Sequence, residues 1–446
     1  MEPKKGSLKS TIAVSLTNYL DAGSIVAGAS GLTLWMKYLG LTNVDAGWLN
    51  ALSANCFGAA IGAFIGGRLA DKYGRKTIYT YNMLLYMLGV AIITISFSFP
   101  MLLAGFLITG ISVGVGVPAS WTYISETSEV KNRGRNIGIS QLAWSVGPVI
   151  IFLFGWLFSP KGFLGEEVRS LGAFVLQTDN SAALDLFGNR LIFFTLFVVA
   201  FIAWRLQCQL NESAEWTEMK EKRAEAVLKK PEHPYKELFT NLINIKSVAF
   251  LVGIYLTWNF VAGTMGFFMP AIYKTAGNLD ESTANLLQAV MWGLTALFSF
   301  FGFAMLADKV NQRFLYAFGT SLGVAAWIVL TFVGVNNETA VWAFVVLWGV
   351  HAGFGVQAFY ALWASEIFPA RYRAAAQGVM FFIVRAGAGI WSFIYTGVFM
   401  GSDFSGVGKV MIGLLFVALL VGVFGTPKTR GKSLKQITEE LYGNQG

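Results

Sequence analysis

Three ionisable residues fall within long apolar stretches of the chain: Asp21 in NYLDAGSIVAG, His351 in LWGVHAGFGVQAFYALW and Arg385 in VMFFIVRAGAGIWS. Charged groups are costly in a membrane, and those found there usually serve a function. A carboxyl group shielded from water can take up a proton, and an imidazole titrates near neutrality. A guanidinium keeps its charge and must find an anion. The three residues therefore predict proton coupling and the binding of a polar partner.

Each of these residues has more than one interpretation. Asp21 either carries a coupled proton or makes a hydrogen bond that only packs helices together. His351 is either a second proton carrier or a neutral residue with satisfied hydrogen bonds. Arg385 could bind a carboxylate of the solute in a bidentate manner, pair with Asp21, or contact a structural cluster of carbonyl groups.

Neutral polar and aromatic side chains complete the expected substrate cavity. With Arg385, the predicted substrate-binding residues are Gln141, Trp144, Asn259, Gln288, Trp292, Gln357, Trp363 and Trp391, and Trp258 is a further ring of this kind. Indole rings can stack on a sugar ring, although most tryptophans in membrane helices serve packing or the interface.

Long apolar segments must position these residues. Of the 446 residues, 55% are hydrophobic and 13% are charged, whereas soluble chains carry about 25% charged residues. Runs of about 20 apolar residues can cross a bilayer as helices. They lie at about 11–36, 47–66, 77–97, 99–125, 136–158, 189–207, 247–272, 283–306, 314–335, 339–365, 374–399 and 407–425. The sequence predicts an all-α membrane protein with twelve transmembrane helices.

The positive residues predict how these helices are oriented. Most of the 33 Lys and Arg residues fall in alternate loops, which are expected in the cytoplasm. The exceptions are Lys37, Lys161, Arg169, Arg190, Lys274, Lys409 and the intramembrane Arg385. Both termini are therefore expected in the cytoplasm, and the first segment is expected to be a retained helix rather than a signal peptide. Compact loops and a short tail suggest a bacterial inner membrane.

The expected organisation is a pair of six-helix halves. The N-terminal half covers 1–207 and the C-terminal half 247–425, with a cytoplasmic linker at 208–246 and a cytoplasmic tail at 426–446. An internal repeat supports this division, because Glu126, Arg133 and Gly138 recur 240 residues later as Glu366, Arg373 and Gly378. Two pseudo-symmetric halves facing each other across a central cavity explain such a repeat.

A short charged turn, GRLADKYGRK, joins the second and third apolar segments. Gly67 lets two backbones approach closely, and the turn also contains Gly74. Asp71 and Arg75 are four residues apart, so they can pair or reach a neighbouring helix end. Asp71 has a counterpart at Asp308, 237 residues later. The predicted gating residues are therefore Gly67, Asp71, Gly74, Arg75, Glu126, Arg133, Asp308, Glu366 and Arg373. Glu126 and Glu366 either cap helix ends or pair with loop arginines and latch the halves together through modest ion pairs.

The turn GRLADKYGRK resembles the signature loop of the major facilitator superfamily. SEIFPARYRAAAQG (Ser365–Gly378), YISETSEVKNRGR (Tyr123–Arg135) and TPKTRGKSLKQI (Thr426–Ile437) resemble its sugar-porter branch, and NESAEW (Asn211–Trp216) is similar to that branch's PESPRW. The resemblance spans nearly the whole chain. It implies alternating access around a substrate site midway through the membrane.

The resemblance also implies individual roles. Gln141 matches a substrate-binding glutamine of the sugar porters, and proton-coupled members carry an acid at the position of Asp21. Two positions depart from the family: Phe106 stands where those members place an arginine partner, and TWNFVAG (Thr257–Gly263) replaces the motif QQ-x-x-G-x-N. Organic-acid and sialate symporters, which are related to this branch, carry an arginine in helix 11, as this chain does at Arg385.

The predicted function is proton-coupled symport of a small polar solute, either a sugar or a sugar acid or carboxylate. A neutral sugar or polyol porter, facilitative or proton-coupled, is the alternative, ahead of an exporter of amphipathic compounds and a non-transporting nutrient sensor. No nucleophile–base constellation, phosphate loop or metal-ligand cluster is seen, so the sequence predicts no enzyme and no cofactor. The expected partners are the solute, a proton and the lipid bilayer, with no nucleic acid, and the chain is expected to act as a monomer.

Overall fold

The computed structural model describes residues 8–128, 133–209, 212, 217, 220, 238–279, 281–369, 373–399 and 404–443. All regular secondary structure within these ranges is helical. The all-α fold predicted from the apolar segments is therefore confirmed.

The N-terminal half is formed by nine helices in the described ranges. They are α1 (Leu8–Ser30), α2 (Leu32–Leu39), α3 (Asn43–Leu52), α4 (Phe57–Tyr73), α5 (Arg75–Ile95), α6 (Phe99–Thr127), α7 (Arg133–Phe158), α8 (Gly165–Leu176) and α9 (Ser181–Gln207).

The C-terminal half begins with a helix of 34 residues. Its described elements are α12 (Leu242–Thr275), α13 (Glu281–Phe298) with the π-helical turn η2 (Ser299–Ala304), α14 (Gln312–Val333), α15 (Glu338–Phe354), α16 (Val356–Ile367), α17 (Arg373–Ile394) with the π-helical turn η3 (Tyr395–Phe399), α18 (Phe404–Gly425) and α19 (Leu434–Tyr442).

Eleven spans in the described ranges are long and apolar enough to cross a membrane. Helix α1 is the further long helix of the bundle, and its apolar run is interrupted by residues such as Asn18 and Asp21. Both of these side chains are fully buried, so the polar face of α1 points into the protein. Together with α1 these spans correspond to the twelve predicted segments.

The second predicted helix is interrupted near its middle, between α3 and α4. The Ser53 hydroxyl donates to the Asn50 carbonyl (2.7 Å) and accepts from the Asn55 amide (3.0 Å). A serine side chain that bonds the backbone locally competes with the helical hydrogen bonds. The interruption places the Asn55 carbonyl inside the bundle, where it can accept from a side chain.

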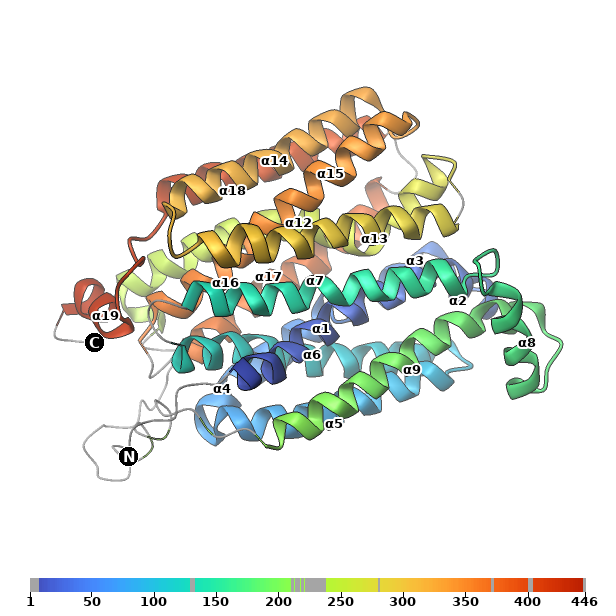
Figure 1. The fold of residues 1–446 in the computed structure, drawn as a ribbon, viewed down its shortest axis with the longest axis horizontal. Coiled ribbons are helices and arrows are strands. Elements are labelled where there is room, and N and C mark those ends of the chain that lie inside the picture. The colour runs from blue at the N-terminus through green and yellow to red at the C-terminus, as the bar shows by residue number, and fades with distance from the viewer. Residues whose placement is uncertain are drawn as a thin grey trace.

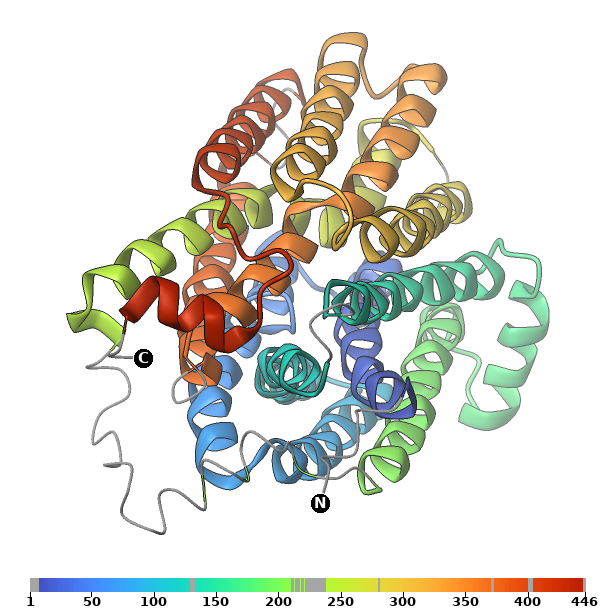
Figure 2. The same ribbon diagram turned by 60° about the vertical axis from the view of Figure 1, so that its left-hand side comes forward.

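The two halves meet along two pairs of helices, α4 with α17 and α7 with α13. In Figure 1 the blue-to-green helices of the first half fill the lower part of the bundle, and most yellow-to-red helices fill the upper part. Figure 2 shows several helices closer to end-on and the two groups side by side. The residues at these two contacts can therefore form one site from both halves.

Helices α4 and α6 pack backbone against backbone at glycines. A Cβ atom on Gly62 would lie 2.0 Å from the Ile111 carbonyl oxygen, and one on Gly114 would lie 2.0 Å from that of Ala59. Small residues allow such close approach between membrane helices. This contact is one reason why the apolar segments pack into a specific bundle.

Large apolar side chains point outward around the bundle. Phe314 is 65% exposed and Phe424 80% exposed. An exposed apolar surface of this kind is expected where a protein faces lipid rather than water. Polar residues are instead buried between the helices, where they can form a site.

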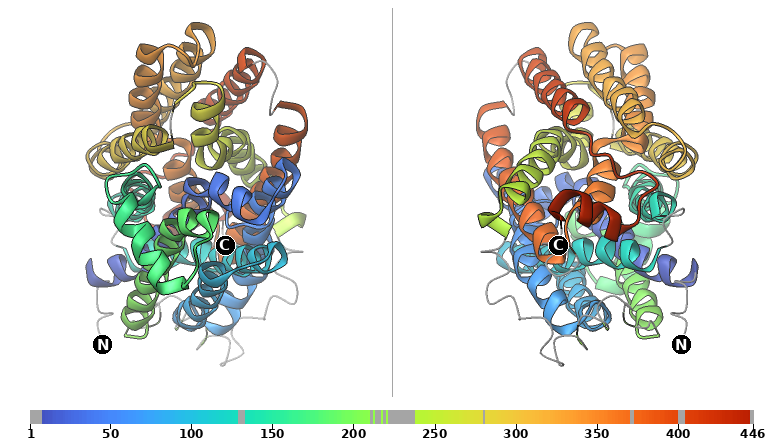
Figure 3. Two further views of the ribbon diagram at one scale, coloured as in Figure 1. Left: turned by 90° about the vertical axis from the view of Figure 1, so that its right-hand side faces the viewer. Right: turned by 90° about the vertical axis from the view of Figure 1, so that its left-hand side faces the viewer.

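Helix α1 begins and α19 ends at the same end of the bundle (Figure 1). There α19 lies across the helix ends (Figure 3, right), and the Tyr442 hydroxyl donates to Oδ1 of Asn244 (2.7 Å). At the opposite end, α8 lies within the 159–189 loop, which carries no recognisable motif, and α9 starts at Ser181 rather than near 189. The Asn180 side chain caps α9 by accepting from two backbone amides.

Most of the predicted linker lies outside the described residues. Glu212 is described, and its Oε2 accepts from the Lys76 backbone amide (3.1 Å) in the first turn of α5. An acid at a helix N-terminus is favourable because the helix dipole is positive there. This contact ties the start of the linker region to the N-terminal half.

Candidate functional site

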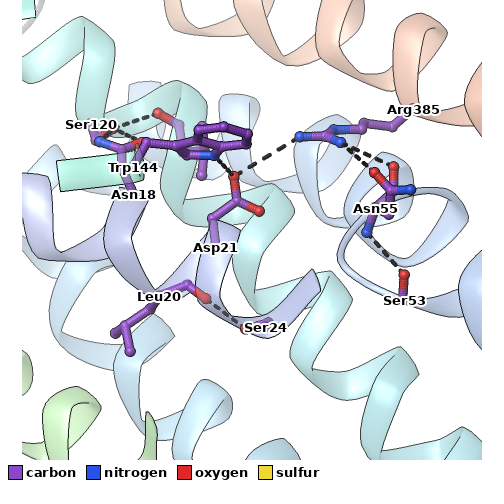
Figure 4. A network of polar contacts seen from close by, with 10 residues as sticks. Asn18, Leu20, Asp21, Ser24, Ser53, Asn55, Ser120, Trp144 and Arg385 are labelled. Carbon is purple, nitrogen blue, oxygen red and sulfur yellow. Dashed lines mark hydrogen bonds and ion pairs between the residues drawn. The ribbon is translucent and has the colours of Figure 1, made fainter. Parts of the chain in front are cut away.

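Asp21 lies at the centre of a polar network inside the bundle (Figure 4). Its carboxylate Oδ2 accepts a hydrogen bond from Nε1 of Trp144 on α7 (2.8 Å), and Nη2 of Arg385 on α17 lies 3.9 Å away. Asp21 is fully buried, and its other oxygen, Oδ1, has no hydrogen-bond partner among the described residues. One acceptor position of the buried acid is therefore left open.

The helix that carries Asp21 is held in place by hydrogen bonds to α5, α6 and α7. Nδ2 of Asn18 donates to the hydroxyls of Ser120 on α6 (3.2 Å) and Ser140 on α7 (2.6 Å). The Tyr86 hydroxyl on α5 donates to the Leu20 carbonyl (3.1 Å). These contacts fix α1 within its own half, whereas Arg385 reaches Asp21 from the other half.

Arg385 is held by the interrupted segment between α3 and α4. Its Nη1 donates to the backbone carbonyl (3.1 Å) and to Oδ1 (3.2 Å) of Asn55, and its guanidinium carbon lies 4.7 Å from the centre of the Phe381 ring. The side chain is buried, and its Nε has no partner among the described residues. Of the alternatives for Arg385, the structure thus places both Asp21 and a carbonyl group beside it.

A central cavity lies beside this network and is lined by both halves. It encloses about 700 Å³ of space not filled by protein atoms, part of it open to solvent. Six predicted substrate-binding residues line it: Gln141, Trp144, Asn259, Trp292, Gln357 and Arg385. Several polar atoms in this wall, among them Nε2 of Gln141 and Nε1 of Trp292, have no partner among the described residues. They are available to a solute.

Trp144 joins the cavity to the buried acid. Its ring lines the cavity, while its indole nitrogen donates to Asp21. The ring also packs edge-on against Trp292 of the opposite half, with the ring centres 5.2 Å apart. A solute that displaces either ring would therefore change the surroundings of Asp21.

His351 lies behind the cavity wall and does not line the cavity. Nε1 of Trp258, which does line it, donates to Nε2 of His351 (3.0 Å), and Nδ1 lies 2.8 Å from the Gly319 carbonyl oxygen. A carbonyl can only accept and an indole N–H can only donate, so Nδ1 carries the hydrogen and the ring is neutral. This geometry matches the interpretation of His351 as a neutral residue with both nitrogens satisfied.

Three of the predicted substrate-binding residues lie away from the cavity lining. Nε1 of Trp363 donates to Oε1 of Gln312 (2.9 Å), and Nε1 of Trp391 donates to the Thr264 hydroxyl (3.1 Å). Gln288 is fully buried on α13, outside the set of lining residues. The spacing of amides and indoles in the sequence could not separate packing positions from cavity positions.

The cavity also contains residues that were not among the predicted set. They include Asn55, Trp348, Thr295 and Ser299. Asn55 carries a signal in the sequence, because SAN (Ser53–Asn55) interrupts an otherwise apolar run. Trp348 carries none, since a tryptophan in an apolar helix gives no indication of which side it faces.

Arg385 is the cation beside Asp21, and Phe106 supplies none. Phe106 is buried and packs edge-on against Phe193, with the ring centres 6.0 Å apart. A Cβ atom on Gly28 would lie 2.9 Å from its ring. The position is therefore part of the apolar packing of the N-terminal half, and the cation beside Asp21 comes from the C-terminal half.

At the end of the bundle where the termini lie, Asp308 connects the two halves. Its Oδ2 accepts from the Arg135 backbone amide (3.1 Å) in the first turn of α7, where the helix dipole favours a negative charge. A Cβ atom on Gly134 would lie 2.6 Å from Oδ1 of Asp308. Glycine at this position therefore allows the acid to approach the helix end.

The other predicted gating residues are only partly described. Gly67 lies within α4, and Gly74, with φ of +98°, forms the turn between α4 and α5. Glu366 and Arg373 are buried, and Nε of Arg373 donates to the Phe368 carbonyl (3.1 Å). The side chains of Asp71, Arg75, Glu126 and Arg133 lie outside the described part of the structure.

Known proteins are similar to this chain in sequence and in fold. A family model described as Major Facilitator Superfamily matches residues 12–393. The chain is 42% identical over 453 residues to the minor myo-inositol transporter IolF of Bacillus subtilis, covering 98% of this chain and 94% of that protein. It is 26% identical over 329 residues to the arabinose-proton symporter of Escherichia coli K12, covering 70% and 65% of the two chains. Its fold is similar to that of the proton:xylose symporter XylE bound to 6-bromo-6-deoxy-D-glucose, with a TM-score of 0.71, 17% identity and coverage of 97% and 98%.

Proposed function

The chain is a sugar-porter-like member of the Major Facilitator Superfamily and is a transporter rather than an enzyme. We propose that it is a proton-coupled symporter of a neutral polyhydroxylated solute. The solute class is a cyclitol or a sugar, moved by alternating access of the central cavity. Asp21 carries the proton, and Arg385 is its charged partner. The membrane is a bacterial inner membrane, with both termini in the cytoplasm.

The ion pair between Asp21 and Arg385 carries this proposal. The two charged groups are 3.9 Å apart, both side chains are almost completely buried, and they belong to different halves. While Asp21 is ionised, it attracts Arg385 across the interface between the halves. Protonation removes this attraction, and Arg385 then keeps its hydrogen bonds to Asn55. The proton therefore changes how strongly the halves are held together beside the cavity.

The residue types of the cavity wall favour a neutral solute. Apart from Arg385, its polar residues are amides, hydroxyls and indoles, including Gln141, Asn259 and Gln357. Amides both donate and accept hydrogen bonds, as hydroxyl groups do. Arg385 already has an anion beside it, so the solute need not supply one. The relative that is 42% identical is named as a myo-inositol transporter, which supports a cyclitol as the first solute to test.

A sugar acid is the second candidate, and one observation favours it. Arg385 lines the cavity, and its Nε has no partner among the described residues. When Asp21 is protonated, a carboxylate of the solute could replace it as the anion beside the guanidinium. The two candidates differ in whether transport needs a cation at position 385.

The experiment is uptake into proteoliposomes with an acidic external solution. The panel contains myo-inositol, neutral sugars, sugar acids and monocarboxylates, and wild type is compared with Asp21→Asn and Arg385→Gln. The exposed acid Asp179 supplies a matched control, Asp179→Asn. We expect accumulation of a neutral solute by wild type and the control. Asp21→Asn should exchange solute across the membrane without accumulating it.

Two results would contradict these assignments. Full accumulation by Asp21→Asn would show that another group carries the proton. Accumulation of a sugar acid alone, together with loss of its binding in Arg385→Gln, would favour the second candidate over the neutral solute.

A further inference from the structure

A second, smaller pocket lies between the central cavity and the end of the bundle opposite the termini. It is formed where α1 and α12 end and α13 begins, and it is lined by Ser30 and Thr33 from the N-terminal half and by Lys274 and Asn285 from the C-terminal half. The pocket thus lies between the two halves, as the central cavity does.

Helix α13 connects the two pockets through one polar stripe. Asn285 lines the outer pocket and Trp292 lines the central cavity, whereas Gln288 lines neither pocket and lies between the two residues along the helix. Their spacing of three and four residues places them on one face of the helix, along about 10 Å of its length. A solute that passes between the pockets would therefore follow this face.

The polar atoms of this stripe are buried without partners. Asn285 is 1% exposed and Gln288 is fully buried. Both amide atoms of each residue, and Nε1 of Trp292, have no hydrogen-bond partner within the described ranges. Leaving a buried donor or acceptor unpaired costs about 1–3 kcal/mol, so such groups in a row call for an explanation.

We propose that Asn285 and Gln288 form an outer subsite that holds a polyhydroxylated solute on its way between the external solution and the central cavity. The proposal rests on the function proposed above. Each amide offers an N–H donor and a carbonyl acceptor, and each hydroxyl of the solute can both accept and donate. A carboxylate can only accept, so it would leave the two amide oxygens unpaired. The subsite therefore selects for hydroxyl groups.

A glycine keeps the subsite open on the side of the other half. A Cβ atom on Gly155 of α7 would lie 3.2 Å from Nδ2 of Asn285 and 3.3 Å from Cβ of Ser30. These contacts are closer than most real side chains make, so a larger residue at 155 would press on the amide. The amide group of Asn285 thus has space that the facing helix leaves free.

The test measures transport from each face of the membrane separately. Radiolabelled myo-inositol uptake is measured in intact cells, which present the outer face, and in inside-out vesicles, which present the cytoplasmic face. The variants are Asn285→Leu and Gln288→Met, which keep side-chain size and remove the amides. Asn82→Leu is the matched control, because both amide atoms of this buried residue on α5 also have no partner among the described residues.

We expect the half-saturating concentration from outside to rise roughly tenfold in each α13 variant, the effect of losing one or two hydrogen bonds. The half-saturating concentration from inside should stay within about twofold of wild type. The ratio of the maximal rates from the two faces should change, because the transport equilibrium itself is unchanged. Replacing an unpaired amide by an apolar group of the same size is near neutral for folding, so thermal melting of all three variants should match wild type. The control should retain wild-type kinetics from both faces.

Three results would overturn the proposal. Unchanged external half-saturation in both α13 variants would show that no solute is held there. Equal changes from both faces would place the amides in the central site or in the fold. Absence of myo-inositol and sugar uptake by wild type would instead refute the proposed function, and the outer subsite with it.

Discussion

Nε1 of Trp144 lies 2.8 Å from carboxylate Oδ2 of Asp21, so a ring that lines the cavity also donates a hydrogen bond to the buried acid. A donor to a carboxylate stabilises its charged form. Contact between solute and ring would therefore change the surroundings of Asp21, the group proposed to bind the proton. The first prediction follows from this pair.

Trp144→Phe should keep a ring in the cavity and remove the hydrogen bond to Asp21. Without the donor the neutral carboxyl is favoured, while Arg385 still faces it, so the pH of half-maximal uptake should move upward. A hydrogen bond to a charged group is worth about 1.5–3 kcal/mol, so its loss should be visible in the pH profile. The measurement is the initial rate of uptake over a range of about pH 5 to pH 9.

Trp292→Phe is the control for that change. It removes another indole N–H from the cavity wall, one with no acceptor among the described residues. Its half-saturating concentration could differ from wild type, but its pH profile should coincide with it. A Trp144→Phe profile that overlaps both would show that the hydrogen bond does not influence protonation of Asp21.

Substitution of His351 should affect solute affinity more than proton coupling. The imidazole anchors the Trp258 indole and is itself bonded to the Gly319 carbonyl. His351→Gln offers a donor and an acceptor in place of the ring, so it should accumulate solute with an unchanged pH profile. His351→Ala should raise the half-saturating concentration several-fold, because Trp258 loses a hydrogen bond worth about 1 kcal/mol. Loss of accumulation with exchange retained, in both variants, would instead identify His351 as a proton carrier.

Asp308→Ala should favour opening of the cavity at the end of the bundle where the termini lie. The variant removes the acceptor at the start of α7, and a charge at a helix N-terminus contributes about 0.3–1 kcal/mol. We expect a two- to fivefold increase in labelling of a cysteine introduced at Gln141 in the cavity wall, by a thiol reagent added from the cytoplasmic face. Cys56 and Cys208 are first replaced by serine.

Gly134→Ala tests the same contact from the opposite side. Its methyl group would press on the Asp308 carboxylate, so its labelling rate should rise as in Asp308→Ala. The exposed acid variant Asp179→Asn serves as the control and should label like the parent. Equal labelling of the parent and the three variants would show that Asp308 does not help to keep the cavity closed at this end.

Gly114→Ala should destabilise the bundle. The added methyl group would lie 2.0 Å from the Ala59 carbonyl oxygen of the facing helix, and the two backbones would have to separate. We expect a clear fall in melting temperature or loss of folded protein in detergent. Gly413→Ala is the control, because no atom lies within 4 Å of its added Cβ. It should match or exceed wild type, since alanine is favoured over glycine in a helix by about 0.5–1 kcal/mol.

The spanning helices could be predicted from the amino-acid sequence, because a run of about 20 apolar residues has few other stable states in a membrane. It also singled out Asp21, His351 and Arg385, because ionisable residues are rare in such runs. Its local motifs indicated the family, and the family comparisons confirmed it. The chemistry that was available could therefore be read from residue types alone.

Which of those residues meet depends on how the helices pack in three dimensions. Asp21 and Arg385 are 364 positions apart, and their proximity depends on how α1 and α17 pack across the two halves. The structure likewise separated the cavity residue Trp292 from Trp363, which is bonded to Gln312. The hydrophobic pattern cannot make this distinction, because a tryptophan occurs on packing faces and on cavity faces of membrane helices alike. The role of the polar face of α13 likewise depends on the tertiary structure, which places a pocket at each end of it.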